Sequence, residues 1–390
     1  MSSFGKYKLD QLGQILDHKR IPINSKLRKE RSGQFPYYGA SGIVDYIDGY
    51  IFEGEHVLIS EDGENLRTRQ TPIAFKADGK FWVNNHAHIF KGKKKWINDY
   101  IVYYFQNTDI NPYITGAVQP KLNKENLLTI PIKTLDENTT KNLVKFIRSF
   151  DDKIELNLQM NQTLEAIAQA IFKEWFVNFR INNEKLRINK KTGLPEGWKE
   201  EYLGKVVAVK GGSTPSTIVS EYWNGKYYWA TPKDLSKQQS PVLLDTERKI
   251  TEAGVKQISS SILPEGTLLL SSRAPIGYLT ISQIPISINQ GFIAIQGKIV
   301  SNLFMYFWLK LNMDKIIGRS NGSTFQEINK TNFKEIKLIV PDKKLLKLYD
   351  GLVNQIFEKI VINTKENQTL TQLRDSLLPR LMSGKINVSR

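Results

Sequence analysis

The sequence predicts an α+β fold in which two mixed α/β globular domains each lead into a long helix. The first observation is a repeat: NQTL occurs at Asn161–Leu164 and again 206 residues later at Asn367–Leu370. The second is a heptad pattern of apolar residues around both copies, which is typical of long helices packed together. The third is a set of short apolar segments in each half, bounded by turn residues, which predict β-strands. So long a period favours duplicated domains over a solenoid.

The repeat extends beyond the helices and divides the chain. GAVQPKLNKENLLTIPI from Gly116 resembles GSTFQEINKTNFKEIKLIVP from Gly322, and LGQIL from Leu12 resembles LGKVV from Leu203. Strands are expected at HVLIS and FWVNNHAHIF in the first half, and at TLLLS and GFIAIQ in the second. A polar, basic stretch with Gly and Pro is the best candidate for a linker. We predict a first domain at 1–135, a first long helix at 136–181, a linker at 182–197, a second domain at 198–340 and a second long helix at 341–386.

Two asparagines fall in the middle of each helical seam: Asn157 and Asn161 in the first helix, Asn363 and Asn367 in the second. Buried Asn costs stability unless it finds a partner, and in coiled coils it fixes the register. Antiparallel packing would pair Asn157 with Asn367 and Asn161 with Asn363. Parallel packing would also match Asn with Asn, so the spacing leaves both arrangements open. The alternative is two amphipathic helices that pack separately on their own domains.

Charge is the unusual feature of the composition. The chain has 55 Lys and Arg against 39 Asp and Glu, a formal net charge of +16. This surplus predicts a polyanionic partner, nucleic acid before membrane, with charge for solubility alone as the alternative. Because Cys is absent, disulfides, thiolate zinc sites and thiol nucleophiles are excluded. The start lacks the pattern of a secretory signal and no apolar stretch approaches the roughly 18 residues of a membrane span, so we expect a soluble, cytoplasmic protein.

Four long segments carry a resemblance to a known family. They are FPYYGASGIVDYIDGYIFEGEHVLISEDGENL from Phe35, NQTLEAIAQAIFKEWFVNFR from Asn161, LPEGWKEEYLGKVV from Leu194 and LTQLRDSLLPRLMSGKI from Leu370. Through them nearly the whole chain resembles the DNA-specificity (S) subunit of type I restriction-modification systems. The first half lacks the LPEGW lead of the second, so its opening strand is expected to be less supported.

The resemblance implies that each globular domain is a target recognition domain that reads half of a split site on double-stranded DNA. It also implies that the two helices form an antiparallel coiled-coil spacer with pseudo-twofold symmetry. The chain would then be a non-catalytic subunit that docks two modification (methyltransferase) subunits and works with restriction (nuclease and translocase) subunits. No cofactor is expected in this chain, because S-adenosylmethionine, ATP and magnesium belong to those partners.

Helix geometry agrees with a spacer role. A helix of about 40 residues spans roughly 60 Å, and half-sites one DNA turn apart are separated by roughly 34 Å. The helices would therefore act as a ruler for the gap between half-sites. Pro379 is expected to kink or stop the second helix near Leu378, because proline removes a helical hydrogen bond. The apolar positions expected to dock partner helices are Ile167, Phe172, Phe179 and Leu373.

Two other functions remain as alternatives. One is a self-contained DNA methyltransferase or nuclease, and the other is a coiled-coil adaptor without DNA specificity. Against the enzyme, the sequence has no NPPY or DPPY string, no FxGxG motif and no pattern of paired nuclease carboxylates. An adaptor would protect no defined DNA sequence.

Cationic and aromatic residues of the first domain are candidates for DNA contact, because phosphate contacts need Lys and Arg while base reading needs side chains that reach base edges. The basic run HKRIPINSKLRKER from His18 is predicted to face DNA, with a solvated surface as the alternative. After the turn EDGEN two arginines are expected on one strand face, and the two histidines of NNHAH on another. Too few further ligands accompany these histidines to predict a metal site. The predicted contacts are Lys19, Arg20, Arg28, Tyr37, Tyr38, Arg67, Arg69, His86, His88 and Lys121.

The second domain offers a similar set of candidates. KGGSTPS from Lys210 lacks the GxxxxGK[ST] pattern of a nucleotide-binding loop, so we interpret it as a flexible loop beside DNA. YYWATPKDL parallels PYYGASG of the first domain, although aromatics at such places are also typical of a core. Gln suits adenine in the major groove, and GRSNGS, which ends at Ser323, is expected at a loop tip. The predicted contacts are Lys210, Ser213, Thr214, Trp229, Lys233, Arg273, Gln290, Arg319, Ser320 and Asn321.

Overall fold

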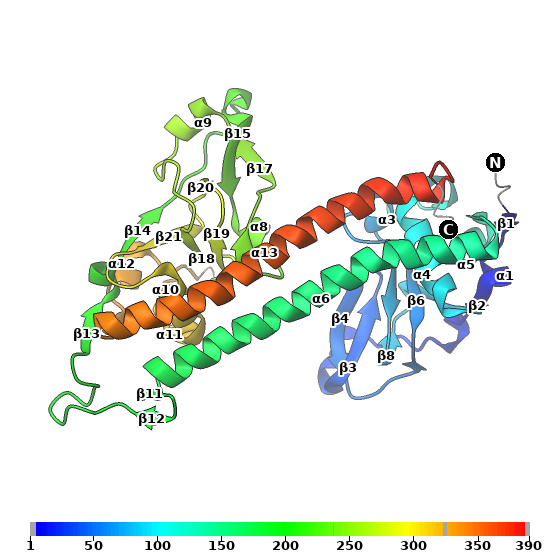
Figure 1. Cartoon of the computed structure of the whole chain (residues 1–390). Helices are drawn as coiled ribbons and strands as arrows, with labels where there is room; N and C mark the ends of the chain where they lie inside the picture. Colours follow the sequence, from blue (N-terminus) through cyan, green and yellow to red (C-terminus); the bar gives the residue numbers. More distant parts are fainter. Residues whose placement is uncertain (1–4, 237, 323–325, 387–390) are drawn as a thin grey trace. The chain divides into compact units, whose positions relative to one another are not determined.

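The computed structural model describes residues 5–236, 238–322 and 326–386 (Figure 1). The chain forms two compact units, the first made of residues 1–153 and 370–390 and the second of residues 154–369. Each unit contains one globular domain and a part of both long helices. Among the described residues, none of the helices combines the length and the apolar character that a membrane span requires.

The first unit is built on two four-stranded sheets and one short strand pair. One sheet has the order β2-β9-β6-β7 and is antiparallel, while the other, β4-β3-β8-β5, contains the parallel pair β3–β8. The opening strand β1 pairs with β10, so it forms without an LPEGW lead. The strands are β1 (Gly5–Tyr7), β2 (Gly13–Ile15), β3 (Ser32–Gly39), β4 (Gly42–Ile47), β5 (Phe52–Glu53), β6 (His56–Ser60), β7 (Ala74–Ala77), β8 (Lys80–Val83), β9 (Ala87–Gly92) and β10 (Ile132–Thr134).

Helices connect these strands and cover one face of the β6 sheet. Alternate residues of β6 point into two different cores, because side chains alternate along a strand: Val57 and Ile59 pack with residues of α4, and Leu58 packs toward the second sheet. The short helices of the unit are α1 (Leu9–Leu12), η1 (Asp17–Lys19), α2 (Ser25–Glu30), α3 (Asn65–Thr68), α4 (Lys95–Asn107), η2 (Asn111–Tyr113) and α5 (Lys124–Thr129).

The second unit repeats this plan with longer connections. Its sheets have the orders β14-β21-β18-β19-β16 and β17-β15-β20, and β13 pairs with β22. The strands are β13 (Lys199–Tyr202), β14 (Val207–Gly211), β15 (Trp223–Ala230), β16 (Val242–Leu243), β17 (Arg248–Ile250), β18 (Leu268–Ser271), β19 (Leu279–Ser282), β20 (Ile286–Ile288), β21 (Phe292–Gly297) and β22 (Lys337–Val340). The short helices are α7 (Leu203–Val206), η3 (Ser220–Tyr222), α8 (Pro232–Ser236), α9 (Glu252–Lys256), α10 (Asn302–Leu311), α11 (Met313–Ile317) and α12 (Lys330–Lys334).

The strand orders of the two units correspond. The run β2-β9-β6-β7 has its counterpart in β14-β21-β18-β19, and the strand pair β1–β10 in β13–β22. Even the parallel pair is repeated, because β15 runs parallel to β20 as β3 does to β8. The domain duplication inferred from the sequence repeat is therefore present in the topology.

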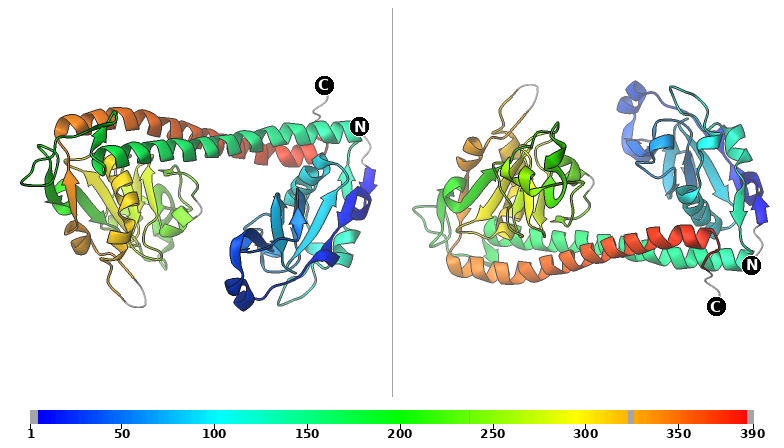
Figure 2. Two further views of the ribbon diagram at one scale, coloured as in Figure 1. Left: turned by 90° about the horizontal axis from the view of Figure 1, so that it is seen from below. Right: turned by 90° about the horizontal axis from the view of Figure 1, so that it is seen from above.

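Two helices of 40 residues each, α6 (Glu137–Phe176) and α13 (Lys343–Met382), pack side by side in opposite directions (Figure 2). Within the second unit Asn157 Nδ2 donates to Asn367 Oδ1 over 2.8 Å, and Asn363 Nδ2 donates to Asn161 Oδ1 over 2.9 Å. Asn161 also donates to Thr364. Both predicted register pairs are confirmed, and the packing is antiparallel.

Each helix also packs on the globular part of its unit. In the first unit Leu143 and Ile147 of α6 share a core with Leu378 and Leu381 of α13 and with α4. In the second unit the aromatic rings of Phe176 and Phe304 lie 5.0 Å apart. The two helices thus pack against each other and also against the globular domains. The alternative, in which each helix packs only on its own domain, is wrong.

The C-terminal end of α13 corrects one expectation. The helix does not stop at Leu378 but continues through Pro379 to Met382. Only one turn follows the proline, so little of the helix depends on the missing hydrogen bond. Leu378 and Leu381 are buried in the first-unit core and hold this last turn in place.

The segment predicted as a linker is ordered against the second unit. It begins in a small hairpin of β11 (Arg180–Ile181) and β12 (Glu184–Lys185). Leu186 and Leu194 pack against the second-unit core, and Trp198 follows with its ring 5.4 Å from that of Phe179. The segment is polar on average, but these few apolar residues are enough to pack it against the second unit.

Candidate nucleic-acid interface

The candidate site of the first unit lies where two central strands end. β6 ends at Ser60, which is opposite Ala87 at the start of β9. Beyond this point the Glu61 amide donates to the His86 carbonyl over 2.9 Å. A loop then crosses over, because the Leu122 amide donates to the Glu61 carbonyl over 2.7 Å. We call this arrangement of residues 60–62, 86–87 and 115–122 the bridged end of the first unit.

The second unit has the same backbone arrangement. Ser271 of β18 is opposite Phe292 of β21, and the Ser272 amide donates to the Gly291 carbonyl over 2.8 Å. The Ile328 amide donates to the Ser272 carbonyl over 3.0 Å, as Leu122 does to Glu61 in the first unit. Residues 271–273, 291–292, 321–322 and 326–328 form the bridged end of the second unit.

The repeated asparagines explain why both loops fold alike. Asn123 and Asn329, 206 residues apart, cap α5 and α12 by accepting from the amide three residues later at 2.8 Å. Asn126 donates to the Tyr113 carbonyl over 2.9 Å, and Asn332 donates to the Arg319 carbonyl over 3.0 Å. The sequence repeat NKEN and NKTN therefore encodes a shared cap and loop anchor.

The side chains on the two bridged ends differ in sign. Asp62 and Lys121 are paired by an isolated antiparallel β-bridge of the backbone in the first unit. Arg273 and Glu327 are paired in the same way in the second. The acid and the base have exchanged places on the same backbone frame. The two ends therefore carry different hydrogen-bonding groups at equivalent positions of the backbone.

Three predicted residues of the first unit gather at its bridged end. His86 Nδ1 lies 2.7 Å from an Asp62 oxygen, and Lys121 Nζ lies 3.4 Å from a Glu61 oxygen. Arg67 donates to the Gly116 carbonyl over 2.9 Å. Lys19 is exposed in η1, outside this group.

The segment after EDGEN was expected to be a strand with Arg67 and Arg69 on one face, and the structure shows that this is wrong. Asn65–Thr68 is a short helix, α3, and Arg69 follows it with a φ of 50°. Arg69 donates to the Gln106 carbonyl over 3.2 Å and also to the Thr108 carbonyl, so it fixes the end of α4. The two guanidinium groups therefore do not share a strand face.

The histidines of NNHAH also separate. His86 precedes β9 in a turn, whereas His88 lies within β9 and is fully buried. His88 Nδ1 lies 2.6 Å from Asp17 Oδ2, and His88 Nε2 lies 2.8 Å from the Leu122 carbonyl. His88 thus holds the Leu122 backbone of the bridged end from inside the domain. Because its side chain is buried, its assignment as a DNA contact is corrected.

Arg20 belongs to the same buried network. Its Nη1 lies 2.6 Å from Glu61, and its Nη2 lies 3.6 Å from Asp17. Burial raises the pKa of Asp17, whereas the hydrogen bond and the charge of His88 lower it. The lowering effects together are larger, so the pKa lies below its ordinary value. Asp17, Glu61 and His88 are close enough to share a cation, and in this arrangement their charge is balanced by the Arg20 guanidinium.

Three further candidates of the first unit make contacts within the domain. Tyr37 is buried and its hydroxyl hydrogen-bonds Ile23, while Arg28 bonds Asp45 over 3.0 Å and stacks over the Tyr37 ring. Tyr38 is half-buried against two phenylalanines.

Two candidates of the second unit differ in their exposure. Trp229 is buried, and its indole donates to the Ser213 carbonyl over 3.2 Å. Lys233 is exposed and pairs with Glu247. The burial of Tyr37 and Trp229 corrects their assignment as DNA contacts.

The remaining second-unit candidates lie around its bridged end. The Thr214 hydroxyl donates to Gln290 over 2.6 Å, and Gln290 directly precedes the paired Gly291. Arg273 lies on the end itself, with Nη1 3.7 Å from Glu327. Lys210 is exposed on β14. Ser323, the last residue of GRSNGS, lies outside the described residues.

Two of these loops are held in place. The Asn321 amide donates to the Glu327 carbonyl over 2.9 Å, and Ser320 donates its hydroxyl to the Ile317 carbonyl. The loop of KGGSTPS is tied by Ser213, whose amide donates to the Ile288 carbonyl and whose hydroxyl accepts from the Ser259 amide over 2.9 Å. These bonds tie the start of the loop to β20 and to Ser259.

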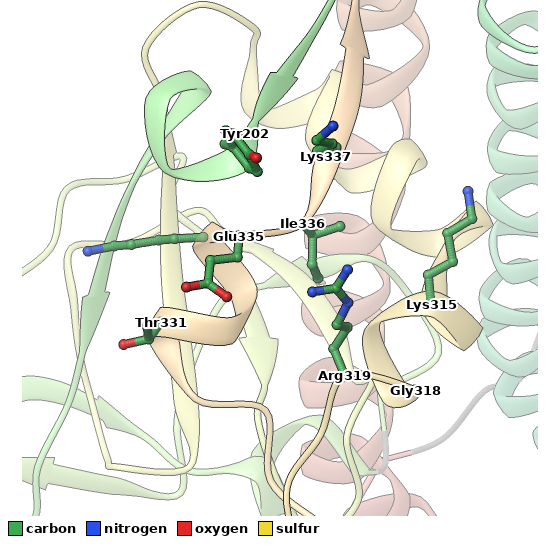
Figure 3. A pocket seen from close by; sticks show the side chains of 9 residues that line it. Tyr202, Lys315, Gly318, Arg319, Thr331, Glu335, Ile336 and Lys337 are labelled. Carbon is green, nitrogen blue, oxygen red and sulfur yellow. The ribbon is translucent and has the colours of Figure 1, made fainter.

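A basic groove adjoins the second bridged end (Figure 3). It is lined by four cations, Lys315, Arg319, Lys334 and Lys337, and by one acid, Glu335. Lys337 pairs with Glu200, and the other three cations of this groove form no ion pair with the described residues. In Figure 3 the Arg319 side chain lies below Ile336, with Lys315 to its right.

Comparisons with known proteins identify the family. The model of the type I restriction modification DNA specificity domain matches residues 1–166 and 195–372. The chain belongs to the type I restriction modification DNA specificity family. Specificity subunits are the non-catalytic components of type I restriction-modification systems, in which DNA and the other subunits are their partners.

Relatives cover the chain to different extents. It is 37% identical over 190 residues to the type I restriction enzyme MjaIX specificity subunit of Methanocaldococcus jannaschii, an alignment covering 45% of this chain and 44% of that protein. It is 27% identical over 374 residues to a putative type I restriction enzyme specificity subunit of Haemophilus influenzae, covering 92% and 91%. The solved S subunit from M. genitalium shares the fold, with a TM-score of 0.57 at 16% identity over 97% of this chain and 96% of that one.

The helices of this specificity chain expose some of the predicted docking positions and bury others. Ile167 and Leu373 are each 46% exposed. Phe172 is buried between Phe304 and Tyr349, and Phe179 is packed on Trp198. The burial of Phe172 corrects its assignment as a partner contact, whereas the contact of the half-buried Phe179 stays a prediction.

Two residues of the bridged ends escaped the sequence analysis. Asp62 and Glu327 are acids in a basic chain, and a search for cations does not select them. The repeat offers the missing signal, because Lys121 and Glu327 are 206 residues apart, as are the loop-anchoring asparagines. A position inside a repeat that changes charge is a candidate for specificity.

Proposed function

We propose that this specificity chain reads a bipartite site on double-stranded DNA, one half with each globular domain. The observation that carries the proposal is the shared frame of the two bridged ends, on which Asp62 and Lys121 are replaced by Arg273 and Glu327. A common frame would meet each half-site in the same manner, while exchanged side chains would select different bases.

The basic groove of the second unit would add phosphate contacts. Lys315, Arg319 and Lys334 lie beside the second bridged end. Residues 206 positions earlier are Asp109, Tyr113 and Leu128, so the first unit has no matching cations there. The groove would strengthen binding without selecting sequence, because phosphates carry no base information.

The paired helices would set the gap between half-sites. The register pairs Asn157–Asn367 and Asn161–Asn363 fix α6 against α13, and each helix of 40 residues would span roughly 60 Å. Their exposed apolar side chains, such as Ile167 and Leu373, would dock two modification subunits. Those subunits and the restriction subunits would hold S-adenosylmethionine, ATP and magnesium.

Methylome sequencing tests the reading function. Hosts that express the modification subunits with this chain should carry methylated adenines in one defined bipartite sequence, and hosts without the chain should not. Adenine methylation that does not depend on the chain, or that follows no common sequence, would contradict the proposal.

A separate experiment tests the ruler. Inserting one heptad into both helices lengthens each by about 10 Å. The methylated half-sites should keep their sequences and move further apart. An unchanged gap would refute the spacer role while leaving DNA reading intact.

A further inference from the structure

One loop of the first bridged end carries an apolar residue at its tip. Thr115 and Lys121 close the loop with a pair of backbone bonds of 2.8 and 2.7 Å. Val118 lies between them and is 97% exposed, more than any other described large apolar side chain. Exposure of this degree gains nothing for folding, because a side chain stabilises the fold by leaving water.

The loop is built to hold its shape. Arg67 donates to the carbonyls of Gly116 and Ala117 at 2.9 and 3.3 Å, and the Gly63 amide donates to the Pro120 carbonyl over 3.0 Å. Gly116 has a φ of 82°, and a Cβ there would lie 2.1 Å from the Gln119 carbonyl oxygen. The turn therefore depends on glycine, and the tip is held before any ligand arrives.

The surroundings of the tip are cationic. Arg67 is exposed, and the Lys121 side chain is 52% exposed. The nearby carboxylates of Asp62 and Glu61 are largely covered and engaged with His86, Arg20 and Lys121. An apolar tip flanked by cations matches the edge of DNA, where phosphates flank base edges.

We propose that Val118 makes an apolar contact with the C5-methyl group of a thymine in the half-site read by the first domain. Of the groups on a base edge in the major groove, only the thymine methyl is apolar. Side chains that wedge between base pairs are typically larger, such as Phe, Leu, Ile, Met and Pro. The short branched side chain of valine favours contact with a methyl group over insertion. This inference rests on the proposed DNA-reading function.

The test uses the full chain in complex with its modification subunits and duplexes that carry the site found by methylome sequencing. Each thymine is replaced in turn by deoxyuridine, which removes only the methyl group. One replacement should weaken binding to the unaltered complex by about fourfold to fifteenfold, as expected when a contact that buries one to two methyl groups is lost. Val118→Ala should weaken binding to the natural duplex by a similar factor.

The coupling between the two changes decides the result. With Val118→Ala, the sensitive deoxyuridine replacement should cause no further loss. Val118→Ile should bind within about twofold of the natural chain, since it keeps the apolar branch. The control Ile299→Ala removes an exposed branched side chain of the second unit, beyond the far end of β21, and should leave both affinities unchanged.

Three outcomes would overturn the inference while the proposed function stands. They are full binding after every single deoxyuridine replacement, additive effects of Val118→Ala and every deoxyuridine, and 2-aminopurine fluorescence that rises on binding and is lost with Val118→Ala, which would mark a wedge. A complex that methylates no defined sequence would instead refute the function on which the inference rests.

Discussion

The buried pair Asn161–Asn363 allows a sharp test of how the two helices find their register. Asn363 is 1% exposed, and its amide donates to Asn161 over 2.9 Å, while its Oδ1 accepts no hydrogen bond from the described residues. Replacing Asn161 by Leu leaves the Asn363 amide buried without this acceptor. Stranding a buried polar group costs about 1–3 kcal/mol, and the incoming Leu faces an amide rather than an apolar partner.

Replacing both asparagines should reverse the loss. A Leu–Leu pair leaves no polar group stranded and buries apolar surface at the same position. The double variant Asn161→Leu/Asn363→Leu should therefore be at least as stable as the natural chain. The coupling energy between the two substitutions should be about 1 kcal/mol or more.

Hydrogen exchange of the full chain, resolved over residues 154–176 and 343–369, measures this locally without requiring two-state unfolding. Backbone amides there should exchange about tenfold faster in Asn161→Leu, which corresponds to about 1.4 kcal/mol, and no faster than normal in the double variant. The control Gln162→Leu changes an exposed neighbour and should have little effect. Faster exchange in the double variant than in either single one would refute the reasoning.

Three further predictions address the two cores and the groove. The pKa of Asp17 lies below its ordinary value of 3.8 because of His88; such a carboxyl contributes stability above the unfolded pKa that is lost as pH falls through the folded one. Acid unfolding of the first unit, followed by circular dichroism, should therefore depend less on pH near and below about 4 in Asp17→Asn. Phe172→Ala should destabilise the second unit by about 3–5 kcal/mol, seen as faster amide exchange there. Lys315→Ala and Lys334→Ala should each lower the slope of log affinity against log salt by about 0.9, with the preferred sequence unchanged in binding titrations.

The helix register could be predicted from the sequence because its signal is local. A heptad pattern and two asparagines per seam lie within one stretch of chain, and the pairs Asn157–Asn367 and Asn161–Asn363 form as expected. The local sequence does not determine the direction of packing, because parallel and antiparallel helices would both match Asn with Asn. Only the family resemblance favoured the antiparallel form. The local effect of Pro379 predicts that the helix stops near Leu378. The helix continues instead to Met382, because Leu378 is buried in the first-unit core.

The site was harder to predict because charge alone does not say what a cation faces. Arg20 stands in a basic run, yet its partner Glu61 lies 41 residues away and is brought close only by the sheet. His88 and Tyr37 are hidden for the same reason. Residues on loops that the repeat preserves, such as Lys121, did reach the bridged end.

The central claim is that two equivalent frames read two different half-sites. It is tested most directly by replacing residues 203–340 with the corresponding region of another family member and sequencing the adenine methylome of a host that carries the modification subunits. One half-site should change, while the other half-site and the gap remain as they were. A change in both half-sites, or in neither, would contradict independent reading by the two units.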